Sequence, residues 1–197
     1  GISLRKLADR ILEESLTGFE FASGIPGSLG GAVTMNAGAY GGEMKDVLLS
    51  ITAMDRNGSI VKIPAQEADL AYRHSIFSDG SYIVLEAELK LEYGNRADIK
   101  AMMDDLNCRR ADKQPLEYPS CGSVFKRPEG YFAGKLIMDS GLAGERCGGV
   151  SVSEKHCGFI INDRGGTASD VLELIRRIQE RVKDRFGVEL ECEVKVL

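Results

Sequence analysis

The chain has 197 residues, 43% hydrophobic and 28% charged, which is ordinary for a globular protein able to bury a core. Its net charge of -5 argues against a general nucleic-acid binder, which would carry a basic excess. No apolar run approaches the roughly 20 residues that cross a bilayer. No charged-then-apolar leader is present either, so we expect a cytoplasmic protein without a membrane span.

The first predicted element is a helix capped by Ser3, with apolar residues at positions 4, 7, 8, 11 and 12 on one face. A glycine-dense stretch follows at 24–42, too rich in glycine for a regular helix and too patterned for a linker. Residues 47–93 indicate β-structure with a hairpin turn at Asn57-Gly58. Acidic and apolar residues alternate over 82–93, as in a half-exposed strand.

The second half mixes helices and strands, with a plausible domain boundary near residue 95. Asn95 can cap a helix that ends at 113–115, with apolar positions 99, 102, 103 and 106 on one face. A short helix at 133–140 and strands at 148–153 and 157–162 follow. The clearest helix is capped by Thr167 and stopped by Gly187, and 188–197 is predicted as a final strand.

The glycine-dense stretch is the first candidate binding element. Its small residues let backbone amides approach a ligand closely, and amides that converge on a concavity bind phosphate. Taken alone, tight turns at a sheet edge are the favoured interpretation, because glycine motifs often occur without a ligand. The pattern is neither GxGxxG after a strand nor a Walker loop, so it indicates neither Rossmann nor P-loop chemistry.

Three further polar segments are candidates. Arg73 beside Tyr72 can clamp a carboxylate or pyrophosphate, although a surface arginine is the favoured interpretation of these residues alone. Residues 113–128 combine a turn of small hydroxyl residues with two basic ones, which suits an anionic ligand. The cluster 154–156 lies between two predicted strands, where a lone histidine is more often structural than catalytic.

The five cysteines give no site of their own. Their odd number and irregular spacing do not indicate a disulfide framework, and the absence of a CxxC pair makes a metal site unexpected. Cys121 lies in the loop of small residues, but neither of the two histidines has a spacing that indicates a Cys–His pair. We therefore interpret the cysteines as scattered reduced thiols.

Taken together and in this order, the segments resemble one family, the UDP-N-acetylenolpyruvoylglucosamine reductases commonly called MurB. The blocks are GIPGSLGGAVTMNAGAYGGE, AYRHSIF, KQPLEYPSCGSVFKRPEGYFAGKLI, GGVSVSEKHCGFIIN and FGVELECEV. The similarity is collinear and runs from about residue 14 to the last residue. The order and length of the blocks make it specific, whereas no single block would.

The resemblance implies an α+β protein, with the C-terminal part of a PCMH/VAO-type FAD-binding domain followed by an α+β substrate-binding domain. Residues 1–95 would form the second lobe of the FAD-binding domain, and 96–197 the substrate-binding domain. The implied reaction is the NADPH- and FAD-dependent reduction of UDP-N-acetylglucosamine enolpyruvate to UDP-N-acetylmuramate in peptidoglycan precursor synthesis. The expected partner is therefore this small-molecule substrate.

By match to the family's motifs, Arg73 corresponds to an arginine that binds the substrate carboxylate. Ser123 corresponds to the serine that protonates the carbanion, and Glu193 to a glutamate that helps to polarise the carboxylate. The implied substrate-binding residues are Tyr72, Lys113, Arg127, Lys135 and His156. The implied flavin-lining residues are Gly24, Ile25, Pro26, Gly27, Ser28, Asn36, Ala37, Gly38, Ala39 and Tyr40.

One departure from the family pattern lowers the expected affinity for FAD. The family begins with a lobe whose GxGSN-type turn grips the FAD pyrophosphate, and this sequence shows no such turn. A nucleotide-sugar-binding fragment without redox activity is therefore an alternative, although the presence of Arg73, Ser123 and Glu193 argues against it. A flavin oxidase with another substrate is a second alternative, against which the blocks after Lys113 argue.

Overall fold

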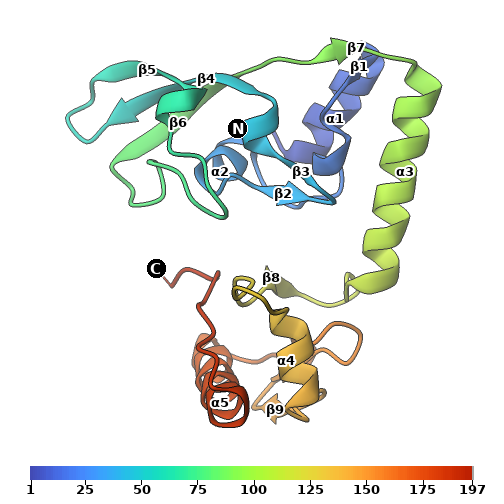
Figure 1. Ribbon diagram of the computed structural model, residues 1–197, viewed down its shortest axis with the longest axis vertical. Coiled ribbons are helices and arrows are strands. Elements are labelled where there is room, and N and C mark those ends of the chain that lie inside the picture. The colour runs from blue at the N-terminus through green and yellow to red at the C-terminus, as the bar shows by residue number, and fades with distance from the viewer. Residues whose placement is uncertain (197) are drawn as a thin grey trace. The chain divides into compact units, whose positions relative to one another are not determined.

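The computed structural model describes residues 1–196, and the chain forms two compact units, Gly1–Arg110 and the residues from Ala111 onward (Figure 1). The boundary expected near residue 95 lies just before α3 (Arg96–Lys113), whereas the two units divide after Arg110, within this helix. The units divide near the end of this helix because Ile99 and Met103 are buried in the first unit's core. Both units mix helices with strands, which confirms the expected α+β class.

The first unit opens with α1 (Leu4–Glu13), whose predicted cap is confirmed. Ser3 Oγ accepts a hydrogen bond from the Lys6 backbone, and the apolar face of α1 is buried. The chain then forms β1 (Leu16–Thr17), which pairs antiparallel with β7 (Glu92–Tyr93). The predicted strand at 82–93 is therefore divided between two sheets.

A three-stranded antiparallel sheet follows, in the order β5–β4–β6. The Asn57-Gly58 turn joins β4 (Leu48–Asp55) to β5 (Ile60–Pro64), as predicted. The Gly58 N–H donates to the Asp55 carbonyl at 3.1 Å, with Gly58 at a φ of +84°. β6 (Tyr82–Leu89) pairs with β4 through two register shifts.

The glycine-dense stretch folds into several short elements beside this sheet (Figure 1). It begins after η1 (Glu20–Ala22) and contains α2 (Leu29–Thr34), which lies against β6. The chain then forms a small hairpin of β2 (Gly38–Ala39) and β3 (Gly42–Glu43). Two further 3₁₀ turns are η2 (Met44–Asp46) and η3 (Ala65–Glu67).

The helix α3 begins as predicted, because Asn95 Oδ1 accepts hydrogen bonds from the backbone of Ala97 at 2.8 Å and Asp98 at 3.3 Å. The expected apolar face of α3 is only partly buried: Ile99 and Met103 are buried, whereas Met102 is exposed. At the other end, Lys155 Nζ donates to the Ala111 carbonyl at 2.7 Å.

The second unit contains a four-stranded sheet in the order β8–β11–β10–β9. The strands are β8 (Ser120–Ser123), β9 (Arg146–Cys147), β10 (Val150–Val152) and β11 (Phe159–Asn162), all antiparallel to their neighbours. Two helices, α4 (Ala133–Asp139) and α5 (Ala168–Phe186), share one buried core with this sheet.

The last helix, α5, has the predicted ends: Thr167 forms a capping box with Asp170, and Gly187 is left-handed. The final strand expected at 188–197 is not formed, residue 197 lying outside the described residues. Alternate residues Val188, Leu190, Cys192 and Val194 do pack on the core. The backbone pairs too briefly for a ladder, with one bridge between Phe125 and Cys192.

Candidate functional site

The two segments predicted to line a flavin lie at the two ends of α2. Ser28 caps the first turn, and its Oγ accepts a hydrogen bond from the Gly31 N–H at 3.3 Å. The exposed residue before it, Gly27, has a φ of +138°, which a residue with a Cβ rarely adopts. At the other end, Asn36 comes after the cap residue Met35 and has a φ of +41°.

The residues 38–43 form the β2–β3 hairpin, with Tyr40 exposed at its tip. A Cβ on Gly38 would lie 2.6 Å from the Gly42 carbonyl oxygen, so only glycine lets the two strands approach. The Arg110 guanidinium lies 5.9 Å from the centre of the Tyr40 ring. Burial lowers the pKa of Arg110, while the phenol of Tyr40 acts in the opposite direction.

Gly24 differs from Gly27 in that its lack of a side chain matters for packing against α3. A Cβ at position 24 would lie 2.3 Å from Asn107 Oδ1 and 3.0 Å from Arg110 Nε, both on α3. This glycine therefore leaves room for two side chains of α3, which would have to move if a larger residue stood here. The sequence could not distinguish the two glycines, because one is needed for backbone conformation and the other for close packing.

Arg73 lies at the tip of a tight turn between Ala71 and His74. These two residues exchange both backbone hydrogen bonds, each at 3.1 Å, and Arg73 has a φ of +53°. Its guanidinium lies 5.1 Å from the centre of the Tyr72 ring. The Arg73 Nη2 donates to the Gly38 carbonyl at 3.4 Å, so the first unit brings Arg73 to the predicted flavin-lining hairpin.

In the second unit, backbone pairing brings the segments of Ser123 and Glu193 together. The Glu193 N–H donates to the Val124 carbonyl at 2.8 Å, which places Glu193 beside the residue that follows Ser123. Ser123 itself is exposed at the end of β8. The pairing makes the two backbone segments neighbours, with Glu193 opposite Val124, and the approach of the Ser123 hydroxyl to the Glu193 carboxyl stays a prediction.

His156 is held as a neutral ring. Burial lowers its pKa, and its Nδ1 accepts a hydrogen bond from the Gly158 N–H at 3.1 Å. A Cβ on Gly158 would lie 2.9 Å from His156 Cε1, and one on Gly134 of α4 would lie 3.3 Å from the same atom. Because Nδ1 is an acceptor, the neutral ring carries its proton on Nε2 and can donate only from there.

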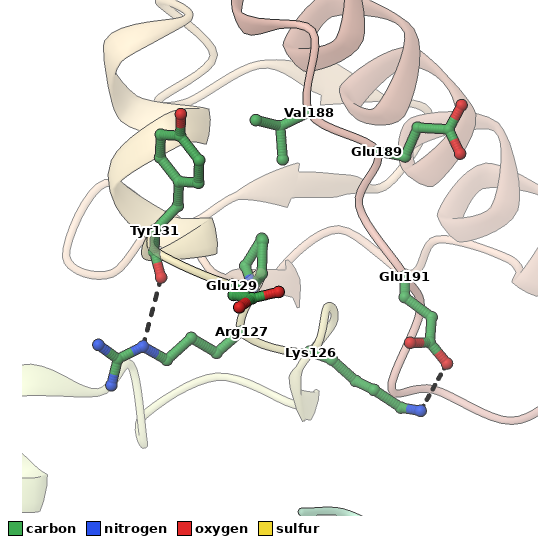
Figure 2. A pocket seen from close by; sticks show the side chains of 8 residues that line it. Lys126, Arg127, Glu129, Tyr131, Val188, Glu189 and Glu191 are labelled. Atoms are coloured by element: carbon green, nitrogen blue, oxygen red, sulfur yellow. Dashed lines mark hydrogen bonds and ion pairs between the residues drawn. The ribbon is translucent and has the colours of Figure 1, made fainter.

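Arg127 lines a cavity of about 380 Å³ in the second unit (Figure 2). Its guanidinium carbon lies 4.0 Å from the centre of the Phe132 ring, and its Nε donates to the Tyr131 carbonyl at 3.3 Å. Lys126, beside it, pairs with Glu191 at 2.5 Å. The other residues that line the cavity are Pro128, Glu129, Val188 and Glu189.

The two remaining predicted substrate-binding residues are Lys135 and Lys113. Within the described residues of the second unit, no hydrogen bond or ion pair joins either of them to the other predicted substrate-binding residues. Lys135 is exposed on α4 and pairs with Asp139 one helical turn later, at 2.8 Å. Lys113 is the exposed last residue of α3. Both side chains are long and flexible, so a role in binding an anion is compatible with these positions.

Two polar residues that support the site were not singled out from the sequence. Glu43 accepts a hydrogen bond from Asn36, and Ser75 Oγ donates to the Thr34 carbonyl at 2.6 Å. Both lie inside the family blocks, but their partners are fixed only by the tertiary fold. Polarity alone gives no signal for such positions.

The residues of the first unit fit a flavin. Gly27 and Gly41 are exposed, and a Cβ at either position would meet no atom within 4 Å, so a ligand could approach their backbone directly. An aromatic ring, Tyr40, and an arginine, Arg73, border the same hairpin. Open backbone amides, a cation and an aromatic face are the groups that bind an anionic, planar cofactor.

Comparisons with known proteins agree with this arrangement. Residues 1–64 match a family described as FAD binding domain, and residues 114–197 match the family described as UDP-N-acetylenolpyruvoylglucosamine reductase, C-terminal domain. A UDP-N-acetylenolpyruvoylglucosamine reductase of Lachnoclostridium phytofermentans is 57% identical over 197 residues, which are all of this chain and 64% of that protein. One of Exiguobacterium sibiricum is 58% identical over 94% of this chain and 61% of its own length.

A solved structure shows the same fold. The crystal structure of UDP-N-acetylenolpyruvylglucosamine reductase (MurB) from Thermus caldophilus superposes with a TM-score of 0.88 at 36% identity. The match covers 100% of this chain and 70% of that one. The chain thus has the fold of a flavin-binding protein joined to a second domain. It belongs to the UDP-N-acetylenolpyruvoylglucosamine reductase family.

The chain spans about two thirds of the length of its relatives, at 61% and 64% of the two curated proteins named above. Within residues 1–196, none of the helices is both long and apolar enough to cross a membrane.

Proposed function

We propose that a protein containing this chain reduces UDP-N-acetylglucosamine enolpyruvate to UDP-N-acetylmuramate with NADPH and FAD, a step of peptidoglycan precursor synthesis. The observation that carries the proposal is the 57% identity to a UDP-N-acetylenolpyruvoylglucosamine reductase over all 197 residues of the chain. The grouping of Arg73 with the hairpin at 38–43 supports it. So does the pairing of the segments around Ser123 and Glu193.

Arg73 has the electrostatic role. FAD, once bound and reduced by NADPH, supplies the hydride. Addition of hydride to the enolpyruvyl double bond builds negative charge on the carbon beside the substrate carboxylate. A guanidinium paired with that carboxylate spreads and stabilises the charge, because two parallel N–H donors match two carboxylate oxygens.

Ser123 completes the addition by giving a proton to the same carbon, and its oxygen is reprotonated from solvent. A serine hydroxyl is a weak acid in water, so it can serve only against a strongly basic carbanion in a site from which water is excluded. Glu193, on the neighbouring strand segment, helps to polarise the substrate carboxylate. Hydride and proton together account for the two hydrogens gained.

The binding residues divide between the two units. The segments Gly24–Ser28 and Asn36–Tyr40 would hold the flavin, through exposed backbone at Gly27 and through the hairpin tip. The nucleotide-sugar would contact Arg127 and Lys113, and Lys135 where it can leave Asp139. Tyr72 stacks beside Arg73, and His156 would donate from Nε2 as a neutral group.

The test measures oxidation of NADPH that depends on the enolpyruvate substrate. The protein tested contains this chain, has the full length of its relatives and is supplied with FAD. We expect Arg73→Lys to lower kcat/KM by about tenfold or more, because lysine cannot form the bidentate pair. Arg56→Lys, in the exposed hairpin turn, is the matched control and should leave the rate unchanged. Absence of substrate-dependent oxidation in the unaltered protein, or equal rates with Arg73→Lys, would refute the proposal.

A further inference from the structure

The side chain of Asn36 is fully buried and joins three separate segments of the first unit. Its Nδ2 donates to the Ala71 carbonyl at 3.0 Å and to Glu43 Oε2 at 2.8 Å. Its Oδ1 accepts a hydrogen bond from the Lys45 N–H at 2.9 Å. Both amide hydrogens and the amide oxygen are therefore bonded within the protein.

The backbone of Asn36 fixes where this amide lies. The residue comes directly after Met35, the cap of α2, and has a φ of +41°, a left-handed conformation that asparagine tolerates better than most residues. The Ala37 N–H then returns to the Ala32 carbonyl at 2.8 Å. The amide is thus placed at the junction between the end of α2 and the beginning of the hairpin.

Two anchors attach the Arg73 turn to this junction. On one side, Ala71 O accepts from both His74 N and Asn36 Nδ2. On the other side, Ser75 Oγ donates to the Thr34 carbonyl, the last residue of α2, at 2.6 Å. The direct bond from Arg73 to Gly38 is long at 3.4 Å, and the two anchors tie the backbone on either side of Arg73 to the end of α2.

We propose that Asn36 is a positioning residue, whose amide sets the place of the Arg73 guanidinium relative to the 36–40 segment. This inference deepens the proposed function and rests on it for its consequence in catalysis. It also gives the Asn36 side chain a different role from direct contact with the flavin. An aspartate at this position would keep the bond from Lys45, but would place a carboxylate against the Ala71 carbonyl and Glu43.

The test is limited tryptic cleavage after Arg73 in the folded chain, measured against cleavage after Arg56. Asn36→Asp and Asn36→Gly both suit a positive φ, so neither adds backbone strain. We expect either variant to raise the ratio of the two cleavage rates by about fivefold to tenfold, as loss of one hydrogen bond changes a local opening equilibrium. Asn95→Asp is the matched control, because aspartate caps a helix as well as asparagine does.

Two outcomes would overturn the proposal. The first is an unchanged cleavage ratio in the folded Asn36 variants, since a residue that merely stabilises the unit would accelerate cleavage at both sites alike. The second outcome needs no variant. It is that the backbone N–H of His74 in the unaltered chain exchanges its hydrogen with solvent as fast as the same group in an unstructured peptide. The cleavage ratio and the exchange rate are measured without substrate or cofactor. Failure of the proposed reductase activity would therefore leave both results unchanged.

Discussion

The geometry around His156 determines its charge. Its ring lies beside Gly134 and Gly158 and edge-to-face with Phe159, with ring centres 5.0 Å apart. A proton on Nδ1 would oppose the Gly158 N–H, which already donates to that nitrogen. Neutral His156 is therefore part of the packing of the second unit, and its pKa lies below the ordinary histidine value of about 6.5 because burial disfavours the charged ring.

We predict that the stability of the second unit falls as pH falls below about 6.5. The unfolded chain binds the proton more tightly than the folded chain, so this contribution is complete above the unfolded pKa and is lost towards the folded pKa. The measurement is the free energy of unfolding in urea from about pH 7.5 to about pH 5.5.

His156→Gln should flatten this slope, because the titrating ring is gone. His74→Gln is the control, since His74 is exposed and pairs with Asp69 at 3.0 Å in the other unit. The interpretation of His156 would be contradicted if the His156 variant kept the full slope.

At the level of the elements, α5 depends on its first turn. Thr167 Oγ1 accepts from the Asp170 N–H at 3.2 Å, and Asp170 Oδ2 accepts from the Thr167 N–H at 2.8 Å. We predict that Thr167→Ala lowers the free energy of unfolding by about 1 kcal/mol, the usual cost of losing an N-cap. Thr167→Ser keeps the hydroxyl and should lower it much less. Equal losses for the two variants in chemical denaturation would exclude the cap as the cause.

The caps at Ser3, Asn95 and Thr167 could all be predicted from the sequence, because a cap is a contact between residues two or three positions apart. The predicted ladder at 188–197 failed for the opposite reason. Its alternation was correct, but the Leu190 carbonyl is bonded by the side chain of Gln179 on α5 at 2.8 Å. A strand needs a partner along its whole length, and the pattern of one segment does not supply that information.

The candidate site shows the same division between local and distant information. The loops and the left-handed glycines were visible as motifs, whereas the bond from Asn36 to Ala71 joins residues 35 positions apart. Sequence alone therefore predicts candidate segments but not the side chain that connects two of them. Met102 is a similar case, because its helical spacing places it on one face with Ile99 and Met103, yet only its own side chain is exposed among these three.

For the whole molecule, the two units have complementary tasks under the proposed function. The first holds Arg73 beside the hairpin that would line the flavin, and the second holds Ser123 and Glu193 on paired segments. The proposed function requires that these groups serve one reaction. Removal of the serine hydroxyl must then stop reduction of the enolpyruvyl substrate and spare reduction of the flavin by NADPH.

The most direct measurement follows both half-reactions in Ser123→Ala, in a protein that holds this chain at the full length of its relatives. Reduction of bound FAD by NADPH is monitored through the loss of flavin absorbance. In Ser123→Ala this step should proceed at the rate of the unaltered protein. Oxidation of that reduced flavin by the enolpyruvyl substrate should yield almost no product, because the carbanion has no proton donor. Equal slowing of the two half-reactions, or undiminished product formation, would contradict the account.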